Sequence, residues 1–544
     1  MSERFPRSPP HLARHYRDAG FWRDALCDEA LFATAETRPD STALIDRLGP
    51  MSWSELATRV RGCAAGLREL EVARGDTVSW VLPNWREAAI VHWALLHLGA
   101  LSNPIVPIYR HREIRFILTQ AESSVIVIPS EFRNFDYATM LAELRPELPR
   151  LRQVVTVAPN GSPPKGGDLD FEELTYGRTQ TDSTGGVDRS PDDPALLLYT
   201  SGTTADPKGA IHTHNTLDFE LRSMIEFYAL DTHDVIYMPS PLSHVTGLLY
   251  GIQMPALLGG SVVYQDHFDP DRAIALLEEH ACTFSVGATP FLHGLCEAQR
   301  RSPRPLALRT FCCGGADVPP DLIREASKTL GCLANRAYGS TEFPTLTGGN
   351  QDDSEARRAE TDGRVMAHCE VRVVDEEGRE VAAGETGELL ARGPELFTGY
   401  LADVGLDAFD EHGWFSTGDL VSIKDGYLRV EGRRKDIIIR GGENISVKEI
   451  EDLLYAHPDV EEVAVVAMPD PVLVERVCAF VVPGSGCQPT LAELVDSLRK
   501  QKLANQKLPE RMELVEDLPK TASGKVQKHR LRARIRERLE RESG

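Results

Sequence analysis

The chain has 544 residues, of which 42% are hydrophobic and 26% are charged, a balance typical of soluble globular proteins. Its 82 acidic residues outnumber its 60 lysines and arginines, so the formal net charge is −22. These values exclude a disordered or collagen-like chain and argue against a general nucleic-acid binder, because a strongly negative protein repels phosphate backbones.

The first 20 residues contain no apolar run of the kind that forms the core of a signal peptide. The most apolar stretch, residues 88–108, includes two histidines, an asparagine and prolines, which favours buried helix and strand over a membrane span. The 10 cysteines form no Cys-x-x-Cys pair, as expected for reduced core residues rather than a zinc site. We therefore expect a cytoplasmic protein with no integral membrane segment.

Strands and helices are predicted to alternate between residues 193 and 345. The pattern gives strands at 195–199, 283–286, 308–313 and 333–338, and helices at 216–227, 269–280 and 319–330. This alternation is typical of α/β architecture with a doubly wound parallel sheet. The preceding segment, 159–194, is rich in Pro, Gly, Ser and Asp and is predicted to be a surface connection.

The composition changes after Gly432, where a smaller α+β unit is predicted. Its elements are helices at 446–456 and 491–500 and strands at 463–467 and 477–482. The final basic segment carries Leu531, Ile535 and Leu539 at a spacing of four. We interpret it as a terminal helix docked by an apolar stripe, in preference to a helix that binds a membrane surface or nucleic acid.

A loop rich in hydroxyl groups and glycine follows the strand predicted at 195–199. It reads Thr200-Ser201-Gly202-Thr203-Thr204-Ala205-Asp206-Pro207-Lys208-Gly209. Backbone N–H groups, Ser and Thr hydroxyls and one lysine suit phosphate oxygens. The loop is not a Walker A loop, because glycine rather than Ser or Thr follows its lysine. Taken alone, it is equally consistent with a polar surface loop.

Four more motifs follow in order. They are Tyr338-Gly339-Ser340-Thr341-Glu342, Ser416-Thr417-Gly418-Asp419, Gly432-Arg433-Arg434-Lys435-Asp436 and Pro519-Lys520-Thr521-Ala522-Ser523-Gly524-Lys525. With the first loop they resemble the adenylate-forming superfamily of acyl-CoA synthetases, adenylation domains and luciferases over nearly the whole chain. Stretches at 103–107, 287–291 and 440–446 are similar to the branch of short- and medium-chain or alicyclic (cyclohexanecarboxylate-type) acid–CoA ligases.

The resemblance implies a fold of two parts. Residues 1–432 are expected to form a large N-terminal domain of doubly wound sheets with helices and a β-barrel-like part. Residues 433–435, with Lys435 as the hinge, would connect it to a small mobile α+β domain at 436–544. A simple linker without motion is the competing interpretation.

The resemblance also implies an ATP-dependent, AMP-forming reaction with ATP, Mg²⁺ and coenzyme A. A carboxylate attacks the α-phosphate of ATP to give acyl-AMP and pyrophosphate, and the CoA thiol then displaces AMP. Two anions meet in the first step, so charge neutralisation and positioning should carry most of the catalysis.

The family roles fall on four catalytic candidates. Lys525 matches the lysine that bridges carboxylate and α-phosphate, Thr341 would hold that phosphate, and Glu342 matches the Mg²⁺-linked carboxylate. His244 matches the position between the acid pocket and the thiol channel, although a buried core histidine is its competing interpretation.

The remaining site residues implied by the resemblance bind the nucleotide, CoA or the acid. The nucleotide set is Thr200, Ser201, Gly202, Thr203, Thr204, Lys208, Gly315, Ala316, Tyr338, Gly339, Ser340, Asp419 and Arg433, with Asp419 and Arg433 at the ribose. Gly441 and Gly442 would let pantetheine pass, and the acid pocket would include Val245, Thr246, Gly287, Thr289, Gly314 and Pro344. These pocket residues are mostly small or apolar, which favours an apolar acid, medium-chain fatty or cyclic.

Four positions depart from the family pattern. Ala205 replaces a usual glycine, which costs about 1–2 kcal/mol if the site needs positive φ, and Asp206 adds a negative charge. Val447 and Lys528 replace a usual proline and arginine.

Several alternatives stay open. One is a stand-alone acyl-AMP ligase that loads a carrier protein, and another is a non-catalytic nucleotide- or acyl-binding relative. An amino-acid adenylation domain is disfavoured, because the segment around His244 lacks an aspartate for the amino group. The resemblance also allows a homodimer.

Overall fold

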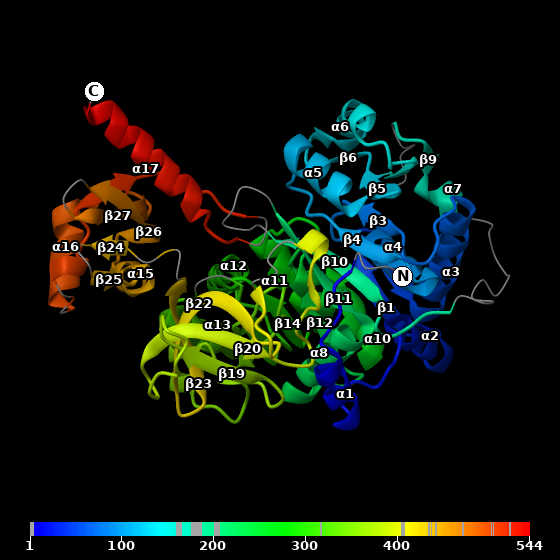
Figure 1. Cartoon of the computed structure of the whole chain (residues 1–544), viewed down its shortest axis with the longest axis horizontal. Helices are drawn as coiled ribbons and strands as arrows, with labels where there is room; N and C mark the ends of the chain where they lie inside the picture. The colour runs from blue at the N-terminus through cyan, green and yellow to red at the C-terminus, as the bar shows by residue number, and fades with distance from the viewer. Residues whose placement is uncertain are drawn as a thin grey trace.

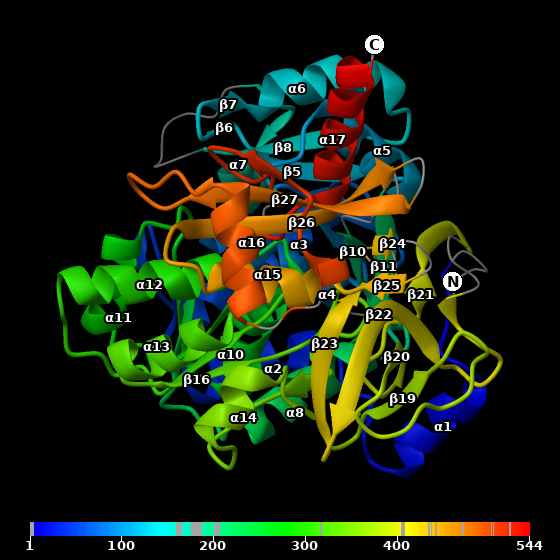
Figure 2. The same ribbon diagram turned by 90° about the vertical axis from the view of Figure 1, so that its left-hand side faces the viewer.

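The computed structural model describes residues 5–158, 166–175, 188–200, 207–315, 318–403, 408–433, 436, 438–440, 443–470, 473–501, 503, 505–521 and 524–543. Figure 1 shows a large body with a smaller C-terminal unit set to one side of it. Viewed at right angles, this unit lies in front of the large body, with β26 and β27 facing the viewer (Figure 2). Mixed α/β architecture with a large and a small part is therefore confirmed.

Two sheets with parallel centres form most of the large body. The first has seven strands in the order β16 (Leu333–Arg336), β15 (Thr310–Cys313), β14 (Phe284–Gly287), β12 (Val235–Met238), β13 (Ser261–Tyr264), β1 (Thr42–Asp46) and β2 (Gly49–Ser52). The second has eight, in the order β21 (Gly399–Tyr400), β11 (Lys208–Thr213), β10 (Pro194–Thr200), β4 (Leu101–Pro104), β3 (Thr77–Trp80), β5 (Val125–Pro129), β8 (Gln153–Val157) and β9 (Leu169–Asp170). Among the described residues, antiparallel strands of these two sheets lie only at the edges, at β2 and at β11–β21.

Helices connect and cover these strands. They are α1 (Pro10–Asp18), α2 (Cys27–Thr37), α3 (Trp53–Glu69), α4 (Arg86–Leu98), α5 (His111–Ala121), α6 (Tyr137–Leu144), α7 (Phe171–Thr175), α8 (His214–Phe227), α9 (Val245–Gly247), α10 (Met254–Leu258), α11 (Pro270–Glu279), α12 (Thr289–Arg301), α13 (Pro320–Leu330) and α14 (Glu355–Glu360), with a π-helical segment, η3, at Leu248–Gln253. The elements predicted between 193 and 345 are all present. Elements of this range that were not predicted from the sequence are β11, β12, β13, α9, η3, α10 and α12.

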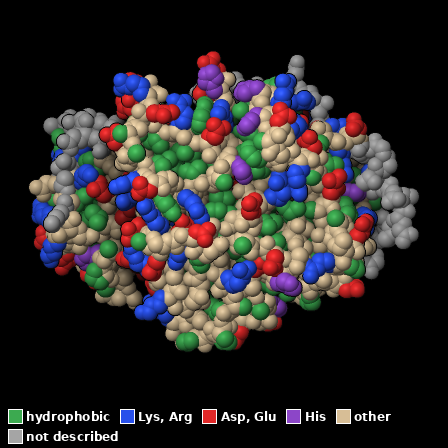
Figure 3. Space-filling view, turned by 90° about the horizontal axis from the view of Figure 1, so that it is seen from below, with side chains coloured by type: hydrophobic (Ala, Val, Ile, Leu, Met, Phe, Trp, Pro, Cys, Tyr) green, Lys and Arg blue, Asp and Glu red, His purple; other side chains and the backbone are tan. Residues whose placement is uncertain are grey.

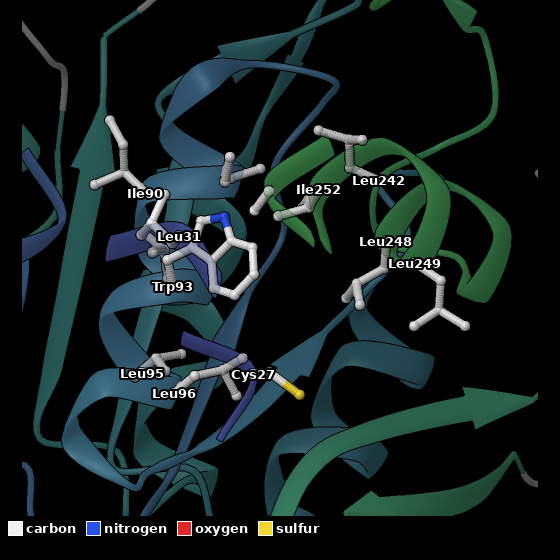
Figure 4. Packing of buried hydrophobic residues seen from close by; sticks show 14 of the residues in the cluster. Cys27, Leu31, Ile90, Trp93, Leu95, Leu96, Leu242, Leu248, Leu249 and Ile252 are labelled. Atoms are coloured by element: carbon white, nitrogen blue, oxygen red, sulfur yellow. The ribbon is translucent and has the colours of Figure 1, made fainter. Parts of the chain in front are cut away.

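Helix α4 lies at the centre of the core. All of its residues from Glu87 to Leu98 are buried, as expected for a helix that is apolar on every side. Its hydrophobic cluster includes Val78 of one sheet and Ile236 of the other. Figure 4 shows Trp93 of α4 between Leu31 of α2 and Ile252 of η3. The prediction that residues 88–108 form buried helix and strand is confirmed, since α4 is followed by β4.

The segment predicted as a surface connection at 159–194 is not wholly irregular. It includes β9 and α7, and Phe171 and Leu174 of α7 are buried. Two apolar side chains one turn apart were enough to dock this short helix, although the surrounding composition is that of a loop. Residues 159–165 and 176–187 lie outside the described residues.

The third sheet of the large body is antiparallel and has six strands. Their order is β17 (Thr347–Gly348), β18 (Arg364–Val365), β23 (Tyr427–Arg433), β22 (Phe415–Lys424), β20 (Thr386–Arg392) and β19 (Glu370–Val374). In the described part of the chain this sheet stays open, so the barrel-like part does not close into a barrel.

The C-terminal unit has its own sheet and its own core. The sheet contains β25 (Glu443–Ile445), β24 (Ile438–Arg440), β27 (Val474–Pro483), β26 (Val460–Asp470) and β28 (Arg511–Leu514), with helices α15 (Val447–Tyr455), α16 (Leu491–Lys500) and α17 (Lys528–Ser543). Leu531 and Ile535 of α17 are buried in one cluster with residues of β26 and β27. The prediction of a docked terminal helix is confirmed. The hinge at 433–435 stays a prediction.

The surface carries charges of both signs. On the face seen in Figure 3, acidic and basic side chains lie intermixed. Among the described residues, no helix has the length and apolar character that crossing a membrane requires. All ten cysteines are free thiols.

Candidate active site

A cavity of about 970 Å³ lies at the carboxyl ends of the parallel strands β14, β15 and β16, where the C-terminal unit meets the large body. Ligands of open α/β sheets bind at this edge, because the loops that follow the strands diverge there. Gly287 ends β14, Gly314 and Gly315 follow β15, and residues 337–342 follow β16. A Cβ atom on Gly314 would lie only 2.6 Å from the carbonyl oxygen of Ala337, so glycine is needed for the two strand ends to pass.

Most of the site residues expected from sequence line this one cavity. They are Thr200, Lys208, His244, Val245, Thr246, Gly287, Gly314, Gly315, Tyr338, Gly339, Ser340, Thr341, Glu342, Pro344, Asp419, Arg433 and Lys525. Residues far apart in the chain, such as Thr200 and Lys525, thus meet in one place.

Thr289 is the exception among the described candidates. It begins α12, is absent from the cavity lining, and its hydroxyl hydrogen-bonds with the Cys313 side chain. That Thr289 lines the acid pocket stays a prediction. The other candidates, Ser201, Gly202, Thr203, Thr204, Ala316, Lys435, Gly441 and Gly442, lie outside the described residues, as do Ala205 and Asp206.

Asp419 and Arg433 face each other across the hairpin of β22 and β23. They are directly paired in its register, and Arg433 Nε lies 3.0 Å from Asp419 Oδ1. The Tyr338 hydroxyl donates to Asp419 Oδ2 at 2.6 Å. Burial and the neighbouring Asp419 raise the pKa of Tyr338, so its hydroxyl keeps its proton. A carboxylate has about four acceptor positions, so Asp419 can accept two more hydrogen bonds, as a ribose diol would require.

Glu342 is held by a tyrosine that sequence reasoning missed. The Tyr400 hydroxyl donates to Glu342 Oε1 at 2.6 Å, and Lys208 Nζ lies 5.0 Å from the centre of the Tyr400 ring. Tyr400 belongs to none of the five motifs, so no local pattern indicated it. Tyr400 therefore contacts both Glu342 and Lys208.

The carboxylate of Glu342 fits a Mg²⁺ ion that would enter the cavity together with a nucleotide. In the described part of the chain, no group of three or more His, Cys, Asp or Glu side chains is arranged as a metal site. Tyr400 occupies one oxygen of Glu342, which leaves Oε2 as a ligand. Mg²⁺ commonly takes one or two protein carboxylates and completes its shell with phosphates and water.

His212 fixes the backbone of the central motif. It is fully buried, and its Nε2–H donates to the carbonyl oxygen of Thr341 at 2.8 Å. Burial lowers the pKa of His212 to about 4, so the ring is neutral near pH 7. The sequence analysis missed this residue, because its partner lies 129 positions away.

Lys525 lines the cavity, and its ammonium group loses its proton more readily than that of an exposed lysine. Burial, and then the charge of Arg433, lower the pKa of Lys525 to about 8. Its loop is closed locally: the Thr521 N–H donates to the carbonyl oxygen of Lys525 at 2.7 Å, and the Lys525 N–H donates to Thr521 Oγ1 at 3.0 Å. Threonine at 521 therefore holds the lysine backbone in place.

His244 is neutral, and its tautomer follows from its hydrogen bond. Burial, and then the charge of Lys525, lower the pKa of His244 to about 4. Its Nδ1 accepts from the N–H of Thr246 at 3.4 Å at the start of α9. The proton is therefore on Nε2, which can donate to an oxygen in the cavity.

Part of the cavity lining is apolar and belongs to the hydrophobic cluster that includes α4. Residues that sequence reasoning missed there are Met224, Tyr250, Val286, Cys312, Ala337 and Thr345. Tyr250 belongs to η3, six residues after His244, and π-helical turns often occur at functional sites. This part of the lining suits an apolar group, and charged residues line the same cavity.

Two family models match the chain. The AMP-binding enzyme model matches residues 31–401, and the AMP-binding enzyme C-terminal domain model matches residues 449–525. The chain is 36% identical over 530 residues to a medium-chain fatty-acid–CoA ligase from Escherichia coli strain K12, covering 96% of this chain and 93% of that one. It is 33% identical over 550 residues to a 2,3-dihydroxybenzoate-AMP ligase from Bacillus subtilis strain 168, covering 99% of each. The crystal structure of ATP-bound MatB from Rhodopseudomonas palustris superposes with a TM-score of 0.84 at 29% identity, covering 94% of this chain and 99% of that one.

Proposed function

Because the chain belongs to the AMP-binding enzyme family of adenylate-forming ligases, we propose that it is an ATP-dependent, AMP-forming acid–CoA ligase acting on an apolar carboxylic acid. One observation carries the proposal: a single cavity places Lys525, Glu342 and the Asp419–Arg433 pair beside an apolar pocket. This combination of charged and apolar side chains suits a nucleoside triphosphate together with an acid that has an apolar tail.

In the first step, the carboxylate of the acid must approach the α-phosphate of ATP. Asp419 and Arg433 would hold the ribose, and Lys208, with Thr200 and Thr341, would bind phosphate oxygens. Lys525 would sit between the two anions and donate to both, which lowers their repulsion. Mg²⁺ bound at Glu342 would supply positive charge to the phosphates as pyrophosphate leaves.

His244 would contribute as a neutral donor. With its proton on Nε2, it can hydrogen-bond an oxygen of the carboxylate or of the acyl-adenylate without adding charge. A cation at this position would compete with Lys525, and burial, together with the charge of Lys525, lowers the pKa of His244 so that the ring stays neutral.

We propose CoA as the acceptor in the second step. The relative named as a medium-chain fatty-acid–CoA ligase supports this choice, while the relative named as an AMP ligase supports an enzyme that passes its acyl group to a carrier protein. The proposal also keeps the division into residues 1–432 and 436–544, with a rotation about Lys435 between the two steps.

The test is to incubate the purified protein with ATP, Mg²⁺ and a panel of acids, with and without CoA, and to analyse the products by mass spectrometry. We expect acyl-CoA only when CoA is added. Acyl-AMP that accumulates while no thioester forms would overturn CoA as the acceptor and favour a carrier protein. Absence of both products across linear, aromatic and alicyclic acids would contradict the proposed activity.

A further inference from the structure

Tyr250 and Thr345 line the apolar part of the cavity, and their side chains are linked behind it. Both residues are buried, and the Tyr250 hydroxyl lies 2.6 Å from Thr345 Oγ1. The same hydroxyl donates to Oε1 of Glu220, a residue of α8 that does not line the cavity. Glu220 therefore lies behind the cavity wall and bonds to it.

Glu220 is an unusual residue to find in a protein interior. It is 1% exposed, and no Lys, Arg or His in the described residues forms an ion pair with it. The other carboxyl group close to it is the buried Glu395. Burial, and then Glu395, raise the pKa of Glu220 to about 8, so the carboxyl group is mainly protonated near pH 7. An apolar residue of similar volume would avoid the cost of burying this carboxyl group.

The bonds of Glu220 reach two segments that border the cavity. Through Tyr250 it contacts η3, which begins four residues after His244. Through the side chain and backbone of Thr345 it contacts the segment that contains Thr341 and Glu342. These bonds link η3 to the segment that contains Thr341 and Glu342.

We propose that Glu220 is a positioning residue that fixes the Tyr250 ring as the end wall of the acid pocket, so that the site accepts a compact, ring-sized apolar acid and excludes long linear acids. The inference rests on the acyl-adenylate step of the proposed function and is independent of the acceptor. Because the Tyr250 and Thr345 hydroxyls bond to one another and to Glu220, the wall leaves few polar groups for the tail of the acid. The wall therefore selects the acid by the size of its tail and not by a hydrogen-bonding group on it.

The experiment measures acid-dependent pyrophosphate release, without CoA, for benzoate, cyclohexanecarboxylate, octanoate and dodecanoate. The variants are Glu220→Gln, Glu220→Leu, Tyr250→Phe, Tyr250→Ala and the double variant Glu220→Leu/Tyr250→Phe. Glu395→Gln is the matched control, because it alters a buried carboxyl group that makes no bond to Tyr250 or Thr345. Thermal unfolding of each variant shows whether it is folded.

We expect the wild-type protein to prefer the two ring acids over dodecanoate. Glu220→Leu should raise KM for the ring acids about tenfold, the effect of losing roughly one buried hydrogen bond, with KM for ATP nearly unchanged. Glu220→Gln keeps an acceptor for Tyr250 and should lie between wild type and Glu220→Leu. Tyr250→Ala should open the pocket and raise activity with dodecanoate. If Glu220→Leu does not fold, Glu220→Gln and Tyr250→Ala still decide the question.

Three results would overturn the inference. One is a wild-type preference for dodecanoate, and another is an equal change in acid KM for Glu395→Gln. The third is that Glu220→Leu changes KM for the acid as much in the Tyr250→Phe variant as in the wild-type protein. Glu220 is proposed to act through the Tyr250 hydroxyl, which that variant lacks. If pyrophosphate release follows these expectations but no acyl-CoA forms when CoA is added, CoA is rejected as the acceptor. The role of Glu220 then remains supported.

Discussion

The ammonium group of Lys525 has a pKa of about 8, because the enclosed site and Arg433 disfavour its charge. If Lys525 must be protonated to join the two anions, the proton is present below this pKa and is lost as the pH rises through it. We expect kcat/KM for acyl-adenylate formation to decrease as the pH rises above about 8. Pyrophosphate release measured between pH 6 and 10 tests this.

The control is Lys525→Arg, since a guanidinium group stays charged throughout that range. Its profile should lack the decrease near pH 8, whatever its absolute rate. The same alkaline decrease in Lys525→Arg would assign it to another group.

Removal of the Lys525 side chain should separate the two half-reactions. Lys525→Ala should slow acyl-adenylate formation by about 100-fold or more, the usual cost of losing a charge-stabilising donor. Thioester formation from supplied acyl-AMP should decrease much less, because the proposal gives Lys525 no part in that step. Rapid-quench assays of each step provide the comparison, with Lys507→Ala as the control, since Lys507 pairs with Glu449 outside the cavity. An equal loss in both steps would contradict a role for Lys525 in the first step alone.

At the scale of elements, α17 is held to its sheet by one stripe of side chains. Ile535 is fully buried, whereas Leu539 is only partly buried against the same cluster. Ile535→Ala should destabilise the C-terminal unit by about 2–5 kcal/mol, the usual cost of such a cavity, and Leu539→Ala by less. Hydrogen exchange in β26 and β27 would measure the difference. Equal protection in the two variants would argue that the stripe does not hold the helix.

Helices and strands were predicted where the apolar residues that define them lie close together in the sequence. The apolar run that became α4 and β4 and the three-residue stripe of α17 are examples, because burial follows from the spacing of a few neighbours. Residue roles are different, since they depend on partners distant in sequence. Tyr400, His212 and Glu220 act on Glu342, Thr341 and Tyr250, and no short motif joins either member of a pair to the other. The family resemblance pointed to residues that line the cavity, and among the described candidates Thr289 alone is absent from that lining.

For the molecule as a whole, the main prediction concerns the proposed rotation of the C-terminal unit. Lys525 reaches the cavity from that unit, so the structure corresponds to the arrangement proposed for the first step. Lys435→Pro would restrict one backbone angle of the proposed hinge. We expect acyl-adenylate formation to persist and thioester formation to fall by about tenfold or more, as when a conformational step becomes limiting. Single-turnover assays of both steps would show it, with Lys435→Ala as the control for loss of the charge. Normal thioester formation in Lys435→Pro would rule out a hinge at this residue.

Helix α4 has a consequence for how the protein is made. It lies between two sheets, and one of them contains β1 paired with β13, more than 200 positions later in the chain. While the ribosome is still synthesising the middle of the polypeptide, β1 lacks its partner β13, and the cluster around α4 lacks Ile236 of β12. The first half of the nascent chain therefore keeps part of its apolar surface uncovered until β12 and β13 emerge, whereas the C-terminal unit has cores formed by its own residues.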